Sequence, residues 1–425
     1  MTNLDGEGGS LAELDGPRTD PAGPALFEGY GIEIEWMTVA VLDRAVRPLA
    51  PMLLTDRGVL RDERDRGPMG WSNELATHVI EVKTLDVPPS LDGLAARFQG
   101  EAKAINKKLA KVGGRLLGGG AHPTMNPHTD ATLWEAGQSE IYTAYDRIFD
   151  CRGHGWVNLQ STHLNIAFDG DDELRRLHAA VRLVLPLLPG LAAASPYLEG
   201  KRQPFLDARL DTYRYNQARI PEIAGKVIPE PIQSGGDYHR RILAPMYAAI
   251  APHDPEGLLA EEWLNSRGAI VRFDRMALEI RVLDCQESPA QDLAIAAAAV
   301  AVIRALAEGK LPGGLNDDAS TDRLAAHFWN AARHGSAATI DDEEYLACFG
   351  LSELWKPTLH ELWRALLDRH PVAAEHEAPL NRILRSGTLA ERMVRRAGGE
   401  PSEAMLVTLM AELSQCLAKG EAYLP

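Results

Sequence analysis

The chain has 425 residues, 45% of them hydrophobic, which is enough for one large domain or two ordinary ones with a sizeable core. Its formal net charge of -16 argues against broad binding to nucleic acids or anionic membranes, and its four scattered cysteines argue against a disulfide framework and against a zinc site. This cysteine usage fits a reducing cytoplasm best. We expect neither a signal peptide nor a membrane span.

The first 26 residues are rich in Gly, Asp, Glu and Pro and are predicted to be a disordered lead-in, with order beginning near Phe27. Beyond them, alternating β-branched segments predict strands, and apolar residues at helical spacing predict helices. Up to residue 285 the predicted elements are strands at 28–41, 76–83, 116–117 and 157–168, a hairpin partner at 39–46, helices at 91–112, 140–149 and 171–194, an irregular segment at 199–240, and two strand-like runs within 270–282. The rest is predicted to be almost wholly helical, over about 290–308, 321–334, 353–369 and 402–418.

Strands and helices follow one another without a regular βαβ rhythm, and no linker divides the chain after the lead-in. The segments with chemical character extend from Glu33 to Arg281 and can only meet if that span is one domain. We therefore predict a single catalytic domain over 27–425 of the α+β class, with a mostly antiparallel sheet and a helical C-terminal layer from about residue 290.

Acidic residues alternate with core residues on several of the predicted strands. Glu33 and Glu35 share one strand face, because side chains two apart point the same way. Glu74, Glu81 and Glu279 lie in or beside similar runs. Each could belong to the solvated face of an antiparallel sheet, but the repeated pattern favours a concave face lined by acids. Like charges at close range need neutralising, and Mg²⁺ prefers carboxylate and phosphate oxygens.

His163 shares its predicted strand face with Asn165 and is either a metal or substrate contact or a structural hydrogen-bonding group. Arg281 alternates with Glu279, so we expect it to face the same pocket. Arginine suits planar carboxylates and phosphates. The basic candidates for a phosphate or an acidic substrate are Arg214, Lys226, Arg272 and Arg281.

The run Gly118-Gly-Gly-Ala-His-Pro123 follows a predicted strand. Its backbone N–H groups could cradle a phosphate, with His122 as a contact. The run lacks the Gly-Lys-Ser/Thr of a Walker loop, so a tight turn is the better interpretation. No Gly-x-Ser-x-Gly motif supports nucleophilic catalysis.

Several segments together resemble the glutamate–cysteine ligase type 2 family, which includes bacterial carboxylate–amine ligases and is similar to plant-type glutamate–cysteine ligases. They occur in the family's order and approximate spacing, and the resemblance covers roughly residues 28–395. The segments are Gly31-Ile-Glu-Ile-Glu35, Glu74 to Thr84, Gly118 to Pro123, Thr162-His-Leu-Asn165, Leu278 to Asp284, Phe328 to Gly335 and Ile383 to Thr388.

The resemblance implies a glutamine-synthetase-like fold, in which the concave face of a curved antiparallel sheet holds ATP, Mg²⁺ and glutamate. It also implies a ligase. The side-chain carboxylate of glutamate attacks the γ-phosphate of ATP, and an amine, with cysteine as the default acceptor, then displaces phosphate from the acyl phosphate. Many bacterial members carry His-x-His where this chain has His163-Leu-Asn165, which leaves one metal ligand open.

Carried over by position, the resemblance implies the metal ligands, Asn165 and Arg281, and the residue patterns add the other members of three groups of site residues. The catalytic pair is Glu33 and Arg281. The expected metal ligands are Glu33, Glu35, Glu74, Glu81, His163 and Glu279. The expected substrate or nucleotide contacts are Asn165, Arg214, Lys226, Arg272 and His122.

Three alternatives stay open: a ligase for another acceptor amine, a phosphotransferase or metal-dependent amide hydrolase on the same sheet, and a non-catalytic binder of a nucleotide or amino acid. A hydrolase would need no nucleotide and would leave Arg214, Arg272 and Arg281 unexplained. The expected partners are small molecules. The helical C-terminal third is either the assembly surface of a homo-oligomer or a cover for the sheet, and the cover is preferred.

Overall fold

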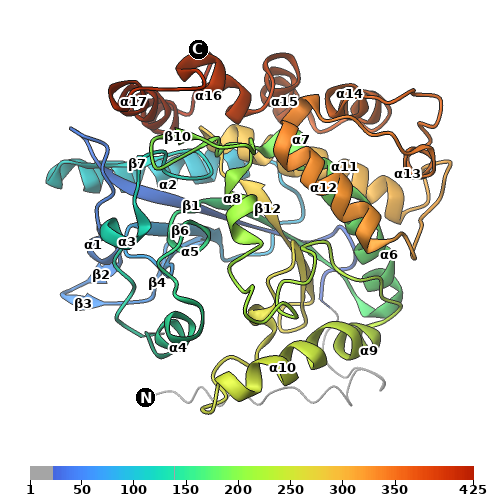
Figure 1. The fold of residues 1–425 in the computed structure, drawn as a ribbon, viewed down its shortest axis with the longest axis horizontal. Helices are drawn as coiled ribbons and strands as arrows, with labels where there is room; N and C mark the ends of the chain where they lie inside the picture. The colour runs from blue at the N-terminus through green and yellow to red at the C-terminus, as the bar shows by residue number, and fades with distance from the viewer. Residues whose placement is uncertain (1–22, 138) are drawn as a thin grey trace.

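An antiparallel sheet of eight strands lies at the centre of the computed structural model, which describes residues 23–137 and 139–425 (Figure 1). The strand order is β11-β12-β8-β1-β6-β5-β4, and β7 pairs with the end of β1. The strands of this sheet are β1 (Tyr30–Ala40), β4 (Glu63–Asp65), β5 (Met69–Asn73), β6 (Val79–Thr84), β7 (Gly114–Leu117), β8 (Ser161–Ala167), β11 (Ala269–Arg272) and β12 (Ala277–Asp284). Two small hairpins lie outside it, β2 (Thr55–Asp56) with β3 (Val59–Leu60) and β9 (Tyr197–Leu198) with β10 (Lys201–Arg202).

The register brings the polar residues of neighbouring strands onto one face. Glu33 of β1 lies opposite both Lys83 and His163, and the next polar position, Glu35, lies opposite Glu81. The intervening apolar residues of each strand point to the other face, since side chains alternate along a strand. The expected face lined by acids is therefore built by the pairing of β1 with both of its long neighbours.

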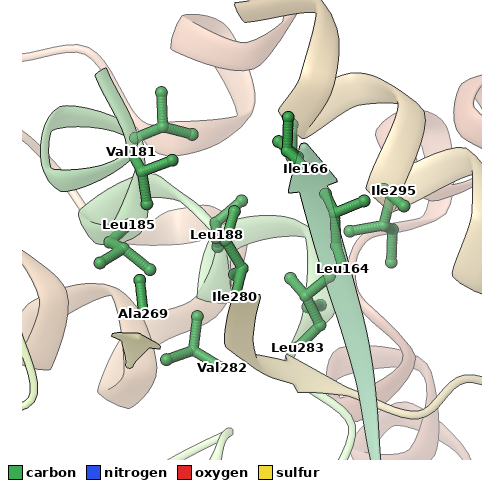
Figure 2. Packing of buried hydrophobic residues seen from close by; sticks show 14 of the residues in the cluster. Leu164, Ile166, Val181, Leu185, Leu188, Ala269, Ile280, Val282, Leu283 and Ile295 are labelled. Atoms are coloured by element: carbon green, nitrogen blue, oxygen red, sulfur yellow. The ribbon is translucent and has the colours of Figure 1, made fainter. Parts of the chain in front are cut away.

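Helices cover the apolar face of the sheet. The nearest are α2 (Leu94–Leu109), α6 (Gly170–Val184) and α11 (Pro289–Ala307), and α11 packs against both others. Figure 2 shows Ile280 of the sheet close to Leu188, and Leu164 close to Ile295 of α11. Among the described helices, α11 alone is long and apolar enough to cross a membrane, and 78% of its apolar window is buried in this core.

The remaining helices surround this core, and α14 to α17 form an outer layer along the top of Figure 1. They are α1 (Ala50–Leu54), α3 (Pro127–Asp130), α4 (Ser139–Phe149), α5 (His154–Val157), α7 (Pro189–Ala192), α8 (Ala208–Tyr213), α9 (Gly235–Tyr238), α10 (Ala244–Ile250), α12 (Thr321–His334), α13 (Glu343–Cys348), α14 (Leu359–Arg369), α15 (Ala374–Ser386), α16 (Leu389–Ala397) and α17 (Glu403–Lys419).

Most of the predicted elements are present, with shifted ends. The helix expected over 171–194 is broken where Pro186 and Pro189 supply no backbone donor. The hairpin partner at 39–46 is reduced to one bridge between Val39 and Val46. The sequence pattern does not predict β5, α13, α15 or α16, and the segment at 199–240 contains α8 and α9. Of the predicted lead-in, residues 1–22 lie outside the described residues.

Candidate active site

A cavity of about 450 Å³ lies over the polar face of the sheet. Its floor consists of alternate residues of β1, β6, β8 and β12, and its rim comes from α4, α5, α8 and the loop before β11. Among the predicted site residues, the cavity lining includes Glu33, Glu35, Glu74, Glu81, His163, Arg272, Glu279 and Arg281. Residues that are up to 248 positions apart in the sequence thus meet at one surface.

Hydrogen bonds hold the floor carboxylates in place. Glu35 accepts from both the backbone N–H and the hydroxyl of Ser161, each at 2.9 Å. Glu81 accepts from the hydroxyl of Ser72 at 2.6 Å. The Nδ1 of His163 lies 3.1 Å from Glu33 Oε2. The acids are mostly buried and have fixed orientations, so they differ from the solvated face that was the alternative for each of them.

Two groups of three ligand atoms could each hold a cation. Oxygens of Glu33 and Glu81 and a ring nitrogen of His163 lie within 4.8 Å of one another, and so do oxygens of Glu35, Glu74 and Glu81. Glu81 belongs to both groups. The second group offers carboxylate oxygens alone and fits a hard divalent cation such as Mg²⁺, whereas the first includes a ring nitrogen of His163.

The acids repel one another in the absence of a cation. Burial and the nearby charges of Glu35 and Glu81 raise the pKa of Glu74 well above its ordinary value. Burial and the charge of Glu33 also raise the pKa of Glu81. Because a carboxylate whose pKa is raised is destabilised in its charged form, a bound divalent cation would relieve both groups.

Glu33 and His163 behave in the opposite way. Burial disfavours the charge on Glu33, but its hydrogen bond and charge interaction with His163 prevail and lower its pKa to about 2. Burial likewise opposes the charge on His163, and Glu33, Glu35 and Glu279 outweigh it and raise its pKa. The carboxylate and the imidazolium therefore stabilise each other's charged form, and a cation bound to Glu33 would compete with the imidazolium.

Arginines flank the acids on the β11–β12 side. Arg281 Nε lies 2.9 Å from Glu279 Oε1, and an Nη1 of Arg272 lies 3.3 Å from Glu279 Oε2. Arg275 contacts Glu33 Oε1 at 3.3 Å. Glu279 thus has an arginine on each oxygen and falls outside both groups of candidate ligands, so in this arrangement it positions arginines rather than offering a free ligand.

A second cavity of about 420 Å³ adjoins the first, and the two share Glu33, Glu63, Lys83 and Arg275. Asn165 lines this second cavity and not the first. Its other walls include apolar side chains, among them Tyr30, Leu85 and Val87.

The structure places three predicted contacts outside both cavities. Arg214 stacks over Trp329, with 4.4 Å from its guanidinium carbon to the ring centroid, and forms an ion pair with Asp211. Lys226 is half-exposed and pairs with Asp322 at the start of α12. Both positive charges are therefore used in contacts outside the two cavities, which corrects the expectation that they reach the substrate.

The expectation that His122 contacts a phosphate is also corrected, because both ring nitrogens form hydrogen bonds to the backbone in and around the turn. Its Nε2 is 2.7 Å from the carbonyl oxygen of Arg44, and its Nδ1 accepts from the backbone N–H of Met125 at 3.0 Å. Gly118, four residues before it, packs on buried backbone: a Cβ there would lie 2.8 Å from the carbonyl oxygen of Gln286. The segment is the tight turn that was the preferred interpretation.

The cavity contains residues that the sequence pattern does not single out. Lys83 lies two residues after Glu81 on β6, so the alternation rule could have found it. Arg209 of α8 is 2% exposed, forms an ion pair with Asp284, and its Nη2 has no hydrogen-bond partner among the described residues. Aromatic side chains form one wall of the cavity, namely Tyr142, Tyr145, Trp156, Tyr213 and Trp263.

Comparison with known sequences shows the protein family to which the chain belongs. A sequence model of glutamate-cysteine ligase family 2 (GCS2) matches residues 30–411. An uncharacterized protein of Archaeoglobus fulgidus is 36% identical over 368 residues, which are 85% of this chain and 91% of that protein. A protein of Nitrosospira multiformis, provisionally named glutamate–cysteine ligase 2, is 24% identical over 196 residues, or 45% of this chain and 49% of that protein.

Solved structures share the fold. A glutamate–cysteine ligase of Francisella tularensis, solved in complex with AMP, has a TM-score of 0.56 at 13% identity and is matched over 92% of this chain and 89% of its own. A bifunctional glutathione synthetase from Pasteurella multocida has a TM-score of 0.59 at 14% identity; the match covers 93% of this chain and 53% of that longer one. The predicted α+β, glutamine-synthetase-like fold is confirmed.

Proposed function

The chain belongs to glutamate–cysteine ligase family 2, and we propose that it is an ATP- and Mg²⁺-dependent ligase that joins the side-chain carboxylate of glutamate to an amine. One observation carries the proposal: buried carboxylates in two three-ligand groups share Glu81 and lie beside arginines in a single cavity. Phosphoryl transfer concentrates negative charge, and it needs both divalent cations and positioned guanidinium groups.

The two adjoining cavities suit the two parts of a nucleotide. The second cavity has apolar walls at Tyr30, Leu85 and Val87 that fit a purine base. Lys83 and Arg275 lie where the cavities join and would receive the phosphates. Mg²⁺ bound to the floor carboxylates would neutralise charge on the β- and γ-phosphates. The AMP in the Francisella ligase supports nucleotide use by this fold.

The residues of the chain position the reacting groups. Arg281 and Arg209 both line the cavity and would hold the glutamate carboxylate or the transferred phosphoryl group. A carboxylate oxygen of glutamate attacks the γ-phosphorus, and ADP leaves. The amine nitrogen then attacks the carbonyl carbon of the acyl phosphate, loses a proton, and phosphate leaves with the carboxylate oxygen.

Cysteine is the first candidate acceptor, because the family is named for it. A larger or aromatic amine is the second, and the aromatic wall favours it. The ring of Tyr145 lies 5.5 Å from that of Trp156 and 6.0 Å from that of Trp263, so one end of the cavity is lined by ring faces and edges. Such a wall binds aromatic groups by offset stacking and cationic groups by cation–π contact.

The test is turnover with a panel of amines. The chain is incubated with ATP, Mg²⁺ and glutamate, and with cysteine, aliphatic, aromatic or polyamine acceptors in turn, while ADP and product mass are measured. We expect ADP to form together with one γ-glutamyl amide. Cleavage of such an amide without ATP would instead indicate the hydrolase, and phosphorylation of a substrate without amide formation would indicate the phosphotransferase.

A further inference from the structure

A buried histidine and two carboxylates meet on the helical side of the molecule, away from both cavities. His376 lies in the first turn of α15 and is 2% exposed. Its Nε2 is 3.3 Å from Glu375 Oε1 and 3.7 Å from Asp92 Oδ1, in the loop before α2. The three ligand atoms lie within 4.8 Å of one another.

The His376 ring lacks the partner that a buried imidazole normally has. Its Nε2 is buried and has no hydrogen bond of suitable geometry among the described residues. A buried ring nitrogen without a partner carries a desolvation cost. A neutral imidazole is the form that binds metals.

The spacing fits a metal better than direct hydrogen bonds. In a tetrahedral site with bonds of about 2.1 Å, neighbouring ligand atoms lie about 3.4 Å apart. The distances of 3.3 and 3.7 Å from Nε2 bracket that value. Glu375 is already oriented, because its Oε1 accepts from the backbone N–H of Gly93 at 2.8 Å. The side chains of Asp92 and Glu375 are 59% and 42% exposed, which leaves an entry path and room for a water ligand.

We propose that His376, Glu375 and Asp92 form a binding site for a divalent cation of the zinc type. One imidazole nitrogen and two carboxylate oxygens, with water in the fourth position, suit Zn²⁺ or Co²⁺ better than Mg²⁺, which prefers oxygen alone. The site would join the loop before α2 to the start of α15. Because both helices pack against α11, the ion would fasten the helical cover to the core.

The test measures zinc binding to the full chain after treatment with a chelator. Isothermal titration with ZnCl₂ is compared between the wild type, H376Q, D92N and E375Q, with E377Q as the matched control because Glu377 is exposed in the same first turn. We expect each ligand variant to lose one zinc equivalent or to bind it with an affinity at least ~10-fold lower, because loss of even a residue that only orients a ligand costs that much affinity. E377Q and H163Q should retain this equivalent, and Co²⁺ should give visible absorption that H376Q lacks.

Two results would overturn the site. One is zinc binding by D92N and E375Q with the stoichiometry and affinity of the wild type. The other is equal loss in E377Q, which would indicate a general charge effect. Both carboxylates are exposed, so D92N and E375Q keep the test valid even where H376Q fails to fold. Circular dichroism and a thermal melt without metal establish folding, and none of these readouts depends on ligase activity.

Discussion

At the scale of single residues, Glu81 shows a conflict between stability and function. It is shared by both candidate cation groups, and burial and Glu33 raise its pKa. A carboxyl group with a raised pKa stabilises the fold only while it is protonated, and that stability is lost as the pH rises through its folded pKa. The charged form therefore weakens the metal-free fold near neutral pH, although the proposed function requires it.

We predict that E81Q is inactive and no less stable than the wild type. Its amide oxygen can still accept from Ser72, while the buried charge is removed. ATP turnover should fall by roughly 10²–10³-fold, the usual cost of losing a group that stabilises transition-state charge. The unfolding free energy in urea at pH 8 without metal should equal or exceed that of the wild type. E28Q, on the exposed segment before β1, should change neither quantity. Unchanged turnover in E81Q would contradict the cation assignment.

Asp292 allows a separate pH prediction, at a residue outside the cavity. Burial raises its pKa to about 7, against hydrogen bonds from Thr162 and the Gln286 amide. With an unfolded value of 3.8, the folded state holds a proton that the unfolded state lacks, so this group costs about 1.4 kcal/mol of stability per pH unit as the pH rises toward 7. The unfolding free energy of D292N, measured by urea titration at each pH, should therefore decline less steeply than that of the wild type from about pH 5 to about pH 7. Equal slopes of unfolding free energy against pH in D292N and the wild type would contradict this prediction.

At the scale of elements, the turn after β7 packs against the Asp284–Arg209 pair, through which it supports the cavity lining. A Cβ on Gly120 would lie 2.3 Å from the carboxyl carbon of Asp284. Asp284 accepts from Ala194 N–H at 2.7 Å and pairs with Arg209, which lines the cavity. Any side chain at this glycine must therefore move the Asp284–Arg209 pair.

We predict that G120A loses about 1–3 kcal/mol of stability, typical of overpacking, and also loses ligase activity through Arg209. G100A is the control. Gly100 lies on the exposed side of α2, and a Cβ there meets nothing within 4 Å. It should gain about 0.5–1 kcal/mol by helix propensity, with activity unchanged. Chemical denaturation and turnover assays measure both effects, and a G120A chain as active as G100A would refute the coupling.

Site residues on long strands could be predicted from the sequence, whereas those placed by short helices or tertiary contacts could not. Alternation on long strands places Glu33, Glu35 and Glu81 on one face, and the same rule reaches Lys83. The alternation rule cannot find Arg209, because this residue lies on α8, a short helix whose start is capped by Asp207 accepting from the Leu210 N–H. Tertiary contacts, which no local pattern encodes, also decide that Arg214 stacks on Trp329.

At the scale of the whole molecule, the sheet and the C-terminal helices share one hydrophobic cluster from Phe27 to Leu417. Trp363 of α14 is fully buried and donates to the Leu187 carbonyl at 2.9 Å. These contacts support the prediction of a single domain over 27–425. A chain truncated before α14 should lack a cooperative thermal transition. Cooperative unfolding of the truncated chain would show that the sheet folds without its cover.

The central claim is that a carboxylate oxygen attacks the γ-phosphate of ATP, and isotope transfer tests it most directly. Glutamate labelled with ¹⁸O in its side-chain carboxylate is incubated with the chain, ATP, Mg²⁺ and the acceptor that gives turnover, and the released phosphate is analysed by mass spectrometry. We predict that one ¹⁸O atom appears in each phosphate formed, in step with the amide. Phosphate without the label, while ADP and amide accumulate, would contradict the acyl-phosphate route.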